Sequence, residues 1–204
     1  MGKKLLLIGA SGHGKVIAYI ARKNGYTEVA FLDDNEAVTQ CAGCPVLGKT
    51  ETAAQYADWD FVVSIGNGAV RQRIQEQLEE KKLSVVSLVH PNAVVADDVQ
   101  LGKGTVIMAG AVVNPGTTLG KGCIVNTCAS VDHDCVVGDY AHVSVGAHVA
   151  GTVRIGKLTW IGAGAVVSNN LEITEDCMIG AGAVVVKNIL KKGTYKGVPA
   201  RCDQ

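Results

Sequence analysis

Aliphatic residues recur at every sixth position over the second half of this chain, from Val95 to Val185, without a miss. An α-helix and a flat strand have side-chain periods of 3.6 and two, so neither produces this interval. A triangular coil with three short strands and three corners does, because each side of the triangle repeats the same inward position. The positions are Val95, Leu101, Ile107, Val113, Leu119, Val125, Val131, Val137, Val143, Val149, Ile155, Ile161, Val167, Ile173, Ile179 and Val185.

A second inward position lies two residues before most of these aliphatics and holds a small residue, which leaves room for the next corner. The repeat therefore predicts coils of about eighteen residues, slightly more than five in all. The cysteines at this position are interpreted as small buried hydrophobes. The small residues are Ala93, Thr105, Ala111, Thr117, Cys123, Ala129, Cys135, Ala141, Ala147, Thr159, Ala165, Cys177 and Ala183.

The pattern before residue 90 alternates strand and helix signals instead. Short apolar runs that end in Gly, Asp or Asn alternate with segments of helical apolar spacing, which predicts a small parallel sheet covered by helices. We therefore expect two domains, 1–90 and 91–204. The expected strands are 4–9, 28–34, 60–67 and 84–90, with a short one at 44–48, and the expected helices are 15–25 and 69–82.

Composition narrows the choice of function. Lys and Arg together number 19, as do Asp and Glu, so no excess charge favours a nucleic acid or a membrane surface as partner. The chain has no apolar run long enough for a membrane span. Its N-terminal segment lacks the long apolar core of a signal peptide, so the LLLIG run is expected to be a buried strand.

The seven cysteines are an odd number without a secretory signal, which favours reduced thiols in the cytoplasm. Cys41 and Cys44 form a single CxxC motif with no second pair at a spacing suited to zinc. They are interpreted as two free thiols in a loop.

The six-residue repeat resembles that of the hexapeptide-repeat acyltransferases, which fold as a left-handed parallel β-helix. The hand follows from the resemblance alone, since the general preference for right-handed crossovers would give the opposite. Such proteins are usually homotrimers. A thin prism also leaves its sides apolar unless neighbouring copies cover them, so length supports association.

Departures from the repeat carry the candidate chemistry. His133 lies between Asp132 and Asp134, and an imidazole is the side chain best suited to take a proton near neutral pH. A carboxylate pairs with a neighbouring histidine only at a corner, because both aspartates would face away on a regular strand. Gly151 follows His133 by eighteen residues and so lies one coil above it, where its N–H could donate to a thioester carbonyl or an oxyanion. A solvated His-Asp corner is the alternative.

The order NTCASVDHDCVVGDYAHVSVGAHVAG, preceded by GASGHG and FLDD, resembles the PglD-like nucleotide-amino-sugar N-acetyltransferases and the related NeuD-like sialic-acid O-acetyltransferases. The resemblance covers almost the whole chain and implies a Rossmann-like α/β domain followed by the β-helix. It implies that His133 is the general base and Asp134 its partner, although glutamate is frequent in the family where this chain has Asp132 and Asp134. The acetyl-CoA contacts implied are His142, Gly151, Ala163 and Ala181, and Asn126 and Asp132 would share one pocket.

The resemblance also implies that residues 187–201 line the tail of acetyl-CoA, where Lys187, Lys191 and Lys192 could meet phosphates. A solvated run of charge explains the three lysines equally well. His148 has no role in the resemblance and is interpreted as structural.

The GASGHG turn at 9–14 follows a strand and opens a helix, a place suited to a phosphate. Its G-x-x-G-x-G spacing departs from the dinucleotide fingerprint, although Asp33 and Asp34 end the next strand as in a dehydrogenase. The resemblance implies instead that this domain holds the nucleotide sugar. The residues that it implies for this substrate are Ser11, Gly12, His13, Asp33, Asp34, Gly66, Asn67 and Arg71.

The leading hypothesis is acetyl transfer from acetyl-CoA to the amine of a UDP-linked 4-amino-4,6-dideoxy sugar, without a metal, at sites between the subunits of a cytoplasmic homotrimer. A sugar O-acetyltransferase is the nearest alternative, since a hydroxyl also needs a base. A zinc lyase of the γ-carbonic-anhydrase type would need three converging histidines, for which His133, His142 and His148 are candidates by number only. A non-catalytic nucleotide-binding protein would not require the clustered His, Asp and Gly departures.

Overall fold

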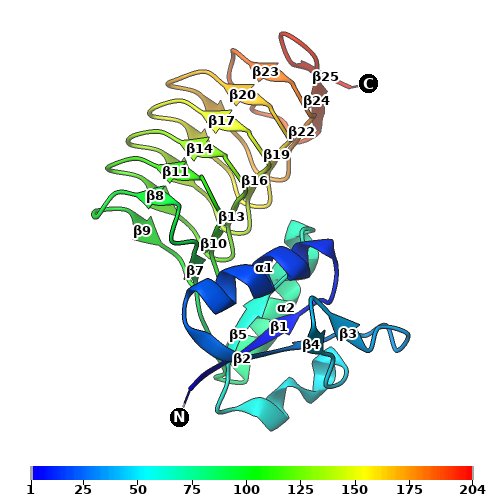
Figure 1. Ribbon diagram of the computed structural model, residues 1–204. Helices are drawn as coiled ribbons and strands as arrows, with labels where there is room; N and C mark the ends of the chain where they lie inside the picture. The colour runs from blue at the N-terminus through cyan, green and yellow to red at the C-terminus, as the bar shows by residue number, and fades with distance from the viewer. Residues whose placement is uncertain (1, 204) are drawn as a thin grey trace. The chain divides into compact units, whose positions relative to one another are not determined.

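The computed structural model describes residues 2–203, which form two compact units that meet in sequence at Pro91 and Asn92 (Figure 1). Unit 1 contains a parallel sheet in the order β2-β1-β5-β6. Both faces of the sheet are covered, so successive residues of β1 from Leu5 to Ile8 are all buried, as expected for a parallel sheet between helices. The elements of this unit are β1 (Lys3–Ile8), α1 (Gly12–Lys23), β2 (Tyr26–Leu32), β3 (Gln40–Cys41), β4 (Cys44–Pro45), η1 (Thr50–Tyr56), β5 (Asp60–Val63), α2 (Gly68–Glu80), β6 (Ser84–Val85) and β7 (Leu88–Val89).

Three details of unit 1 differ from the sequence prediction. The expected strand at 44–48 is one arm of a two-residue hairpin with β3, and Val46 alone forms a bridge with Phe31 of the main sheet. Ala42 and Gly43 both have positive φ, the conformation that such a tight turn requires. The expected strand at 84–90 is split into β6 and β7, and the 3₁₀ helix η1 was not predicted.

Unit 2 is a triangular solenoid of two-residue strands, which confirms the predicted β-helix. Each strand between residues 94 and 167 pairs in parallel with the strand eighteen residues later, as Val112 does with Ser130. Face 1 consists of β10 (Val106–Ile107), β13 (Ile124–Val125), β16 (His142–Val143), β19 (Trp160–Ile161), β22 (Met178–Ile179) and β24 (Thr194–Lys196), with β25 (Arg201–Cys202) antiparallel to β24. Face 2 consists of β8 (Val94–Val95), β11 (Val112–Val113), β14 (Ser130–Val131), β17 (His148–Val149), β20 (Val166–Val167) and β23 (Val184–Val185). Face 3 consists of β9 (Gln100–Leu101), β12 (Thr118–Leu119), β15 (Val136–Val137), β18 (Arg154–Ile155) and β21 (Glu172–Ile173).

The solenoid core is the stack of inward positions that the repeat predicts. From Ile107 to Val185 every sixth aliphatic residue is buried, whereas Val95 and Leu101 in the first coil are partly exposed. The small positions between Thr105 and Ala183 are buried as well, including Cys123, Cys135 and Cys177. The interior is therefore filled by one aliphatic side chain for each strand and, at most strands, one small side chain.

The corners have a period of their own. From Gly104 to Gly182, every sixth residue has a positive φ. Glycine adopts this left-handed conformation without strain, and Asn and Asp tolerate it better than most other residues. This requirement accounts for much of the glycine in the second half of the chain, and it also places Asp134 and Asn170 at corners.

Core stacking predicts unequal costs for two truncations at equivalent positions. Ile161 is fully buried, so Ile161→Ala should lower the free energy of unfolding by about 2–5 kcal/mol through lost burial and a residual cavity. Leu101 is 36% exposed, so Leu101→Ala should cost much less. Urea unfolding of both variants, followed by circular dichroism, measures the difference. Equal losses would contradict the stacked core.

Candidate active site

His133 and Asp134 form a hydrogen-bonded pair at a corner of the solenoid. The corner, residues 132–134, joins β14 of face 2 to β15 of face 3. Asp134 has a φ of 56°, and this left-handed turn brings its carboxylate back to the ring of its neighbour. His133 Nδ1 donates to Asp134 Oδ2 at 2.8 Å, which leaves Nε2 of the neutral ring as the proton acceptor.

The environment of His133 favours its protonated form. The hydrogen bond to Asp134 raises the pKa of His133 above its ordinary value, and the negative charge of Asp132 adds to the effect. Both members of the pair are exposed to solvent. An accessible imidazole with a raised pKa and a free Nε2 can act as a general base.

Asp132 holds the corner and not the imidazole. Its Oδ1 accepts from the side-chain amide of Asn114 at 2.7 Å and from the backbone N–H of His133 at 2.8 Å. The hydrogen bond from Asn114 lowers the pKa of the Asp132 carboxyl below its usual value.

Gly151 stacks against the His133 ring from the next coil. A Cβ at Gly151 would lie 2.5 Å from His133 Nε2, so any larger residue would displace the ring. The Thr152 N–H donates to the His133 carbonyl at 2.8 Å, which ties the two coils together here. Gly151 is itself buried, and within residues 2–203 no group accepts a hydrogen bond from its N–H.

His142 and Asn126 lie together, but on another side of the solenoid. His142 is on β16 of face 1, where it is buried, and its Nε2 lies 3.1 Å from the Asn126 side-chain amide. Its ring packs against Trp160, eighteen residues later, with ring centroids 4.6 Å apart. Face 1 lies opposite the corner between faces 2 and 3. One chain therefore does not bring His142 and Asn126 into a pocket with His133 and Asp132, and their sharing of one pocket stays a prediction about neighbouring subunits.

Ala163 and Ala181 follow β19 and β22 at the corner between faces 1 and 2. They are exposed and lie one coil apart, with the Gly182 N–H donating to the Ala163 carbonyl at 2.8 Å. Near the C-terminal end a cavity of about 310 Å³ is lined by Lys187, Tyr195 and Arg201, among others. Of the other two lysines singled out above, Lys192 pairs with Asp176 at 3.7 Å.

The glycine-rich turn of unit 1 opens α1 as the sequence predicts. Ser11 is the N-cap residue and Gly12 is exposed at the start of the helix. A Cβ at Gly14 would lie 2.5 Å from the Gly9 carbonyl oxygen, so this glycine allows close approach of helix and strand. Burial and the positive charge of Arg71 lower the pKa of His13 to about 4, so His13 is neutral at pH 7.

Several residues expected to bind substrate in unit 1 also hold its backbone. Asp33 accepts from the Ala10 N–H at 2.6 Å, which joins the end of β2 to the glycine-rich turn. Arg71 is buried and donates to the carbonyl oxygens of Ile65 and Gly66 at 2.8 and 2.9 Å. The Asn67 side chain caps α2 by accepting from the Val70 N–H at 3.1 Å. These residues shape the edge of the sheet around the turn.

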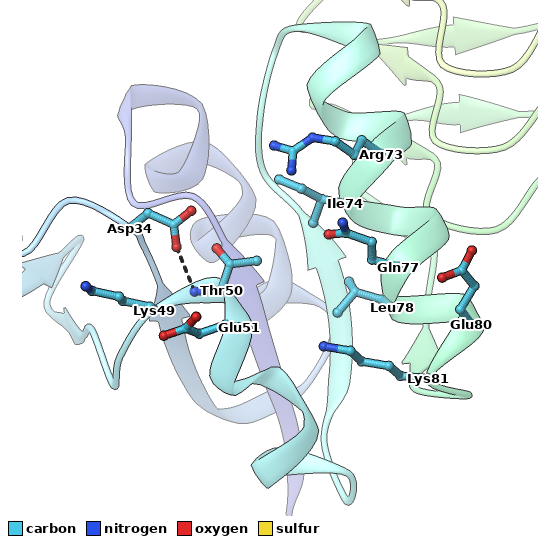
Figure 2. A pocket seen from close by; sticks show the side chains of 10 residues that line it. All are labelled: Asp34, Lys49, Thr50, Glu51, Arg73, Ile74, Gln77, Leu78, Glu80 and Lys81. Atoms are coloured by element: carbon cyan, nitrogen blue, oxygen red, sulfur yellow. Dashed lines mark hydrogen bonds between the residues drawn. The ribbon is translucent and has the colours of Figure 1, made fainter.

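Figure 2 shows a cavity of about 480 Å³ in unit 1, between η1 and α2. Asp34, Lys49 and Thr50 lie on one side of it, and Arg73 and other residues of α2 lie on the other. The Thr50 N–H donates to Asp34 Oδ1 at 2.9 Å. Asp34 is therefore the expected substrate residue that lines this cavity.

Comparison with known proteins agrees with this architecture. The PglD N-terminal domain family matches residues 4–78, and the bacterial transferase hexapeptide family (six repeats) matches residues 152–187. The acetyltransferase domain of PglB from Neisseria gonorrhoeae, solved in complex with acetyl coenzyme A, is 39% identical with a TM-score of 0.95, and the match covers 99% of this chain and 100% of that one. This chain belongs to the PglD-like family of hexapeptide-repeat acetyltransferases.

The names and titles of other PglD-like relatives refer to different amino sugars. PerB from Caulobacter crescentus, solved with CoA and GDP-perosamine, is 33% identical with a TM-score of 0.94 over 98% of this chain and 97% of that one. A variant of the same organism's perosamine N-acetyltransferase with a histidine replaced by asparagine was solved with the same two molecules. The UDP-N-acetylbacillosamine N-acetyltransferase of Bacillus subtilis is 34% identical over 112 residues, 52% of this chain and 52% of its own length. The match thus spans about half of that curated relative.

Three residues near these sites were not predicted from the PglD-like motifs. Trp160 packs on His142, and Lys49 and Arg73 line the cavity of unit 1. The repeat already contained the signal for Trp160, because it lies eighteen residues after His142. Neither lysine nor arginine stood out from an ordinary solvated helix or loop.

The solenoid histidines do not converge. His148 is exposed on face 2, where its Nδ1 lies 2.8 Å from the Ser130 hydroxyl, whereas His133 and His142 are at the places described above. Within residues 2–203, no three His, Cys, Asp or Glu side chains are arranged to hold a metal ion. In the same range, no helix has the length and apolar character needed to cross a membrane.

The His133–Asp134 bond predicts the order of two pKa changes. Asp134→Asn removes the largest contribution to the raised pKa of His133, so this pKa should fall and the ring should lose its proton at lower pH. Asp132→Asn removes only a charge effect and keeps an oxygen for the His133 N–H, so its decrease should be smaller. An NMR titration of the His133 ring measures both. A larger decrease in Asp132→Asn would contradict the assignment of the pair.

Proposed function

We propose that this protein transfers an acetyl group from acetyl-CoA to the amine of a nucleotide-linked amino sugar. The observation that carries the proposal is the His133–Asp134 pair, an accessible imidazole whose Nδ1 is held by a carboxylate at 2.8 Å. PglD-like relatives with names that include N-acetyltransferase, and others solved with acetyl-CoA or CoA, support the reaction.

His133 Nε2 removes the proton of the amine while the nitrogen attacks the thioester carbonyl. The new carbon–nitrogen bond gives a tetrahedral oxyanion, which collapses as the carbon–sulfur bond breaks. The thiolate leaves, and the proton on His133 is returned to it. Asp134 orients the ring and stabilises its positive charge during the transfer.

The oxyanion needs a donor next to the base. The Gly151 N–H is suited to this role because Gly151 lies against the His133 ring and no described group accepts from its amide. The His142 side chain contacts the thioester end of acetyl-CoA, and Ala163 and Ala181 follow along the pantetheine. The cavity of about 310 Å³ beside Lys187 and Arg201 takes the distal end of the coenzyme.

A complete site needs two copies of the chain. His133 lies at the corner between faces 2 and 3, and His142 and Asn126 lie on face 1 near the corner between faces 1 and 2. If face 2 packs toward the axis of a homotrimer, the His133 corner of one copy, between faces 2 and 3, meets the corner between faces 1 and 2 of the next copy. The outward row of face 2 is suited to this because it is mainly valine, with Val94 65% and Val166 39% exposed.

Unit 1 binds the nucleotide of the acceptor sugar. The N-terminus of α1 at Ser11 and Gly12 offers backbone amides to the diphosphate. A neutral His13 contributes a hydrogen bond there and not a charge. The base or ribose occupies the cavity beside Asp34, between η1 and α2. Asp33, Gly66, Asn67 and Arg71 shape the edge of this site.

We propose a UDP-linked 4-amino-4,6-dideoxy sugar as the acceptor. A relative named for UDP-N-acetylbacillosamine supports this choice, and relatives solved with GDP-perosamine make a GDP-linked amino sugar the second candidate. Transfer to a sugar hydroxyl would use the same base, but the relatives named above for an acceptor are N-acetyltransferases.

The proposal predicts that thiol release from acetyl-CoA depends on an amino sugar and on His133. Wild-type protein should release thiol with UDP- or GDP-linked 4-amino sugars and not with their 4-hydroxy analogues. His133→Ala should lower kcat by at least about a hundredfold, the usual contribution of a general base. A spectrophotometric thiol assay measures both effects, and calorimetry should show unchanged acetyl-CoA affinity in the variant. Unchanged turnover without His133 would disprove the assignment.

A further inference from the structure

A side chain in the interior of the solenoid forms hydrogen bonds with the backbone of the corner that carries His133. Thr117 is fully buried in one of the small inward positions. Its hydroxyl donates to the Asp132 carbonyl at 2.7 Å and accepts from the Cys135 N–H at 3.2 Å. These two groups stand directly before and after His133 and Asp134. One hydroxyl therefore bridges both ends of the corner that carries the proposed base.

We propose that Thr117 is a positioning residue for acetyl transfer, a role that rests on the function proposed above. It acts through the corner and touches neither substrate. Loss of the hydroxyl leaves the half-buried Asp132 carbonyl and the buried Cys135 N–H without that partner, so the backbone at 132 and 135 shifts to recover hydrogen bonds. The His133–Asp134 pair is built on that backbone and shifts with it.

The same fold shows which parts of this arrangement are general. Thr105 bridges the Gly120 carbonyl and the Cys123 N–H at 2.8 and 3.1 Å. Thr159 bridges the Thr174 carbonyl and the Cys177 N–H at 2.8 and 3.1 Å. Both span corners between faces 3 and 1, where we place no site residue. They are matched controls, since each offers the same two hydrogen bonds without the base.

Other coils show that the fold tolerates this position without a hydroxyl. Ala129, Ala141, Ala147 and Ala165 occupy equivalent inward positions and are buried. Cys135 occupies the next one above Thr117, where its thiol donates to the Ala150 carbonyl at 3.2 Å and accepts from the Val153 N–H at 3.4 Å. Cys135 thus bridges both ends of the corner that carries Gly151, as Thr117 bridges both ends of the corner that carries His133. Alanine at position 117 is therefore compatible with the coil but removes the bridge.

The test compares Thr117→Val and Thr117→Ala with Thr117→Ser, Thr105→Val and Thr159→Val in the full chain. Thr117→Val and Thr117→Ala should lower kcat by about 10- to 100-fold, as misplaced catalytic groups do, with KM for both substrates changed less than about twofold. Thr117→Ser keeps the hydroxyl and should restore kcat to at least about half of the wild-type value. The two control variants should keep kcat within about twofold of wild type. Circular dichroism confirms that each variant is folded.

An NMR titration of His133 gives a second readout that does not depend on turnover. Thr117→Val should lower the pKa of His133, because the bond to Asp134 loosens, whereas Thr105→Val and Thr159→Val should leave it unchanged. Unchanged kcat and unchanged His133 pKa in Thr117→Val would overturn the proposal. So would an equal loss of kcat in the control variants. A wild-type chain that transfers no acetyl group, but whose His133 pKa still falls in Thr117→Val, would remove the proposed function and keep the positioning role.

Discussion

Registry between coils is the constraint on which the rest of unit 2 depends. Each coil repeats after eighteen residues, and the inward aliphatic of one coil rests on that of the next. A slip of one residue would turn the whole buried set outward, so the register is strongly fixed. For this reason Gly151 must lie above His133, and Trp160 above His142. The contacts of the candidate site are consequences of core packing.

The corners of the solenoid position the candidate catalytic side chains. A residue in the left-handed conformation is needed at each corner, and at position 134 it is an aspartate. The same turn that closes the coil therefore brings a carboxylate to the preceding imidazole, a contact that adjacent residues on a strand could not make. The corner requires a residue of positive φ at position 134, and this residue is an aspartate. The His133–Asp134 pair follows from that requirement. The interior contributes too, because a threonine in place of alanine supplies a hydroxyl that holds the same corner.

The solenoid was predictable because each six-residue unit carries its own signal, so an error at one unit does not spread. Unit 1 was less so. The run at 44–48 reads as a strand, but the left-handed pair Ala42 and Gly43 turns it into a hairpin. Of the site, the stacking of Gly151 on His133 followed from the period. The pairing of His133 with Asp134 was implied by the resemblance and not by the period. The position of His142 could also have been predicted from the repeat. It lies nine residues after His133, which is half a coil, and so on the opposite side of the solenoid from the His133 corner. The burial of His13 beside Arg71, and the bridge made by Thr117, depend on side-chain packing that no short motif records.

The central claim is that one copy supplies His133 and the next supplies His142 to the same site. Coexpression of His133→Ala and His142→Ala chains, each of which we expect to have little activity alone, tests it through the thiol release of the purified mixed assembly. In a mixed trimer, one of the three sites would contain both intact histidines. Because about three quarters of randomly assembled trimers are mixed, about a quarter of wild-type turnover should be recovered. A mixture no more active than the two variants measured separately would contradict the shared site.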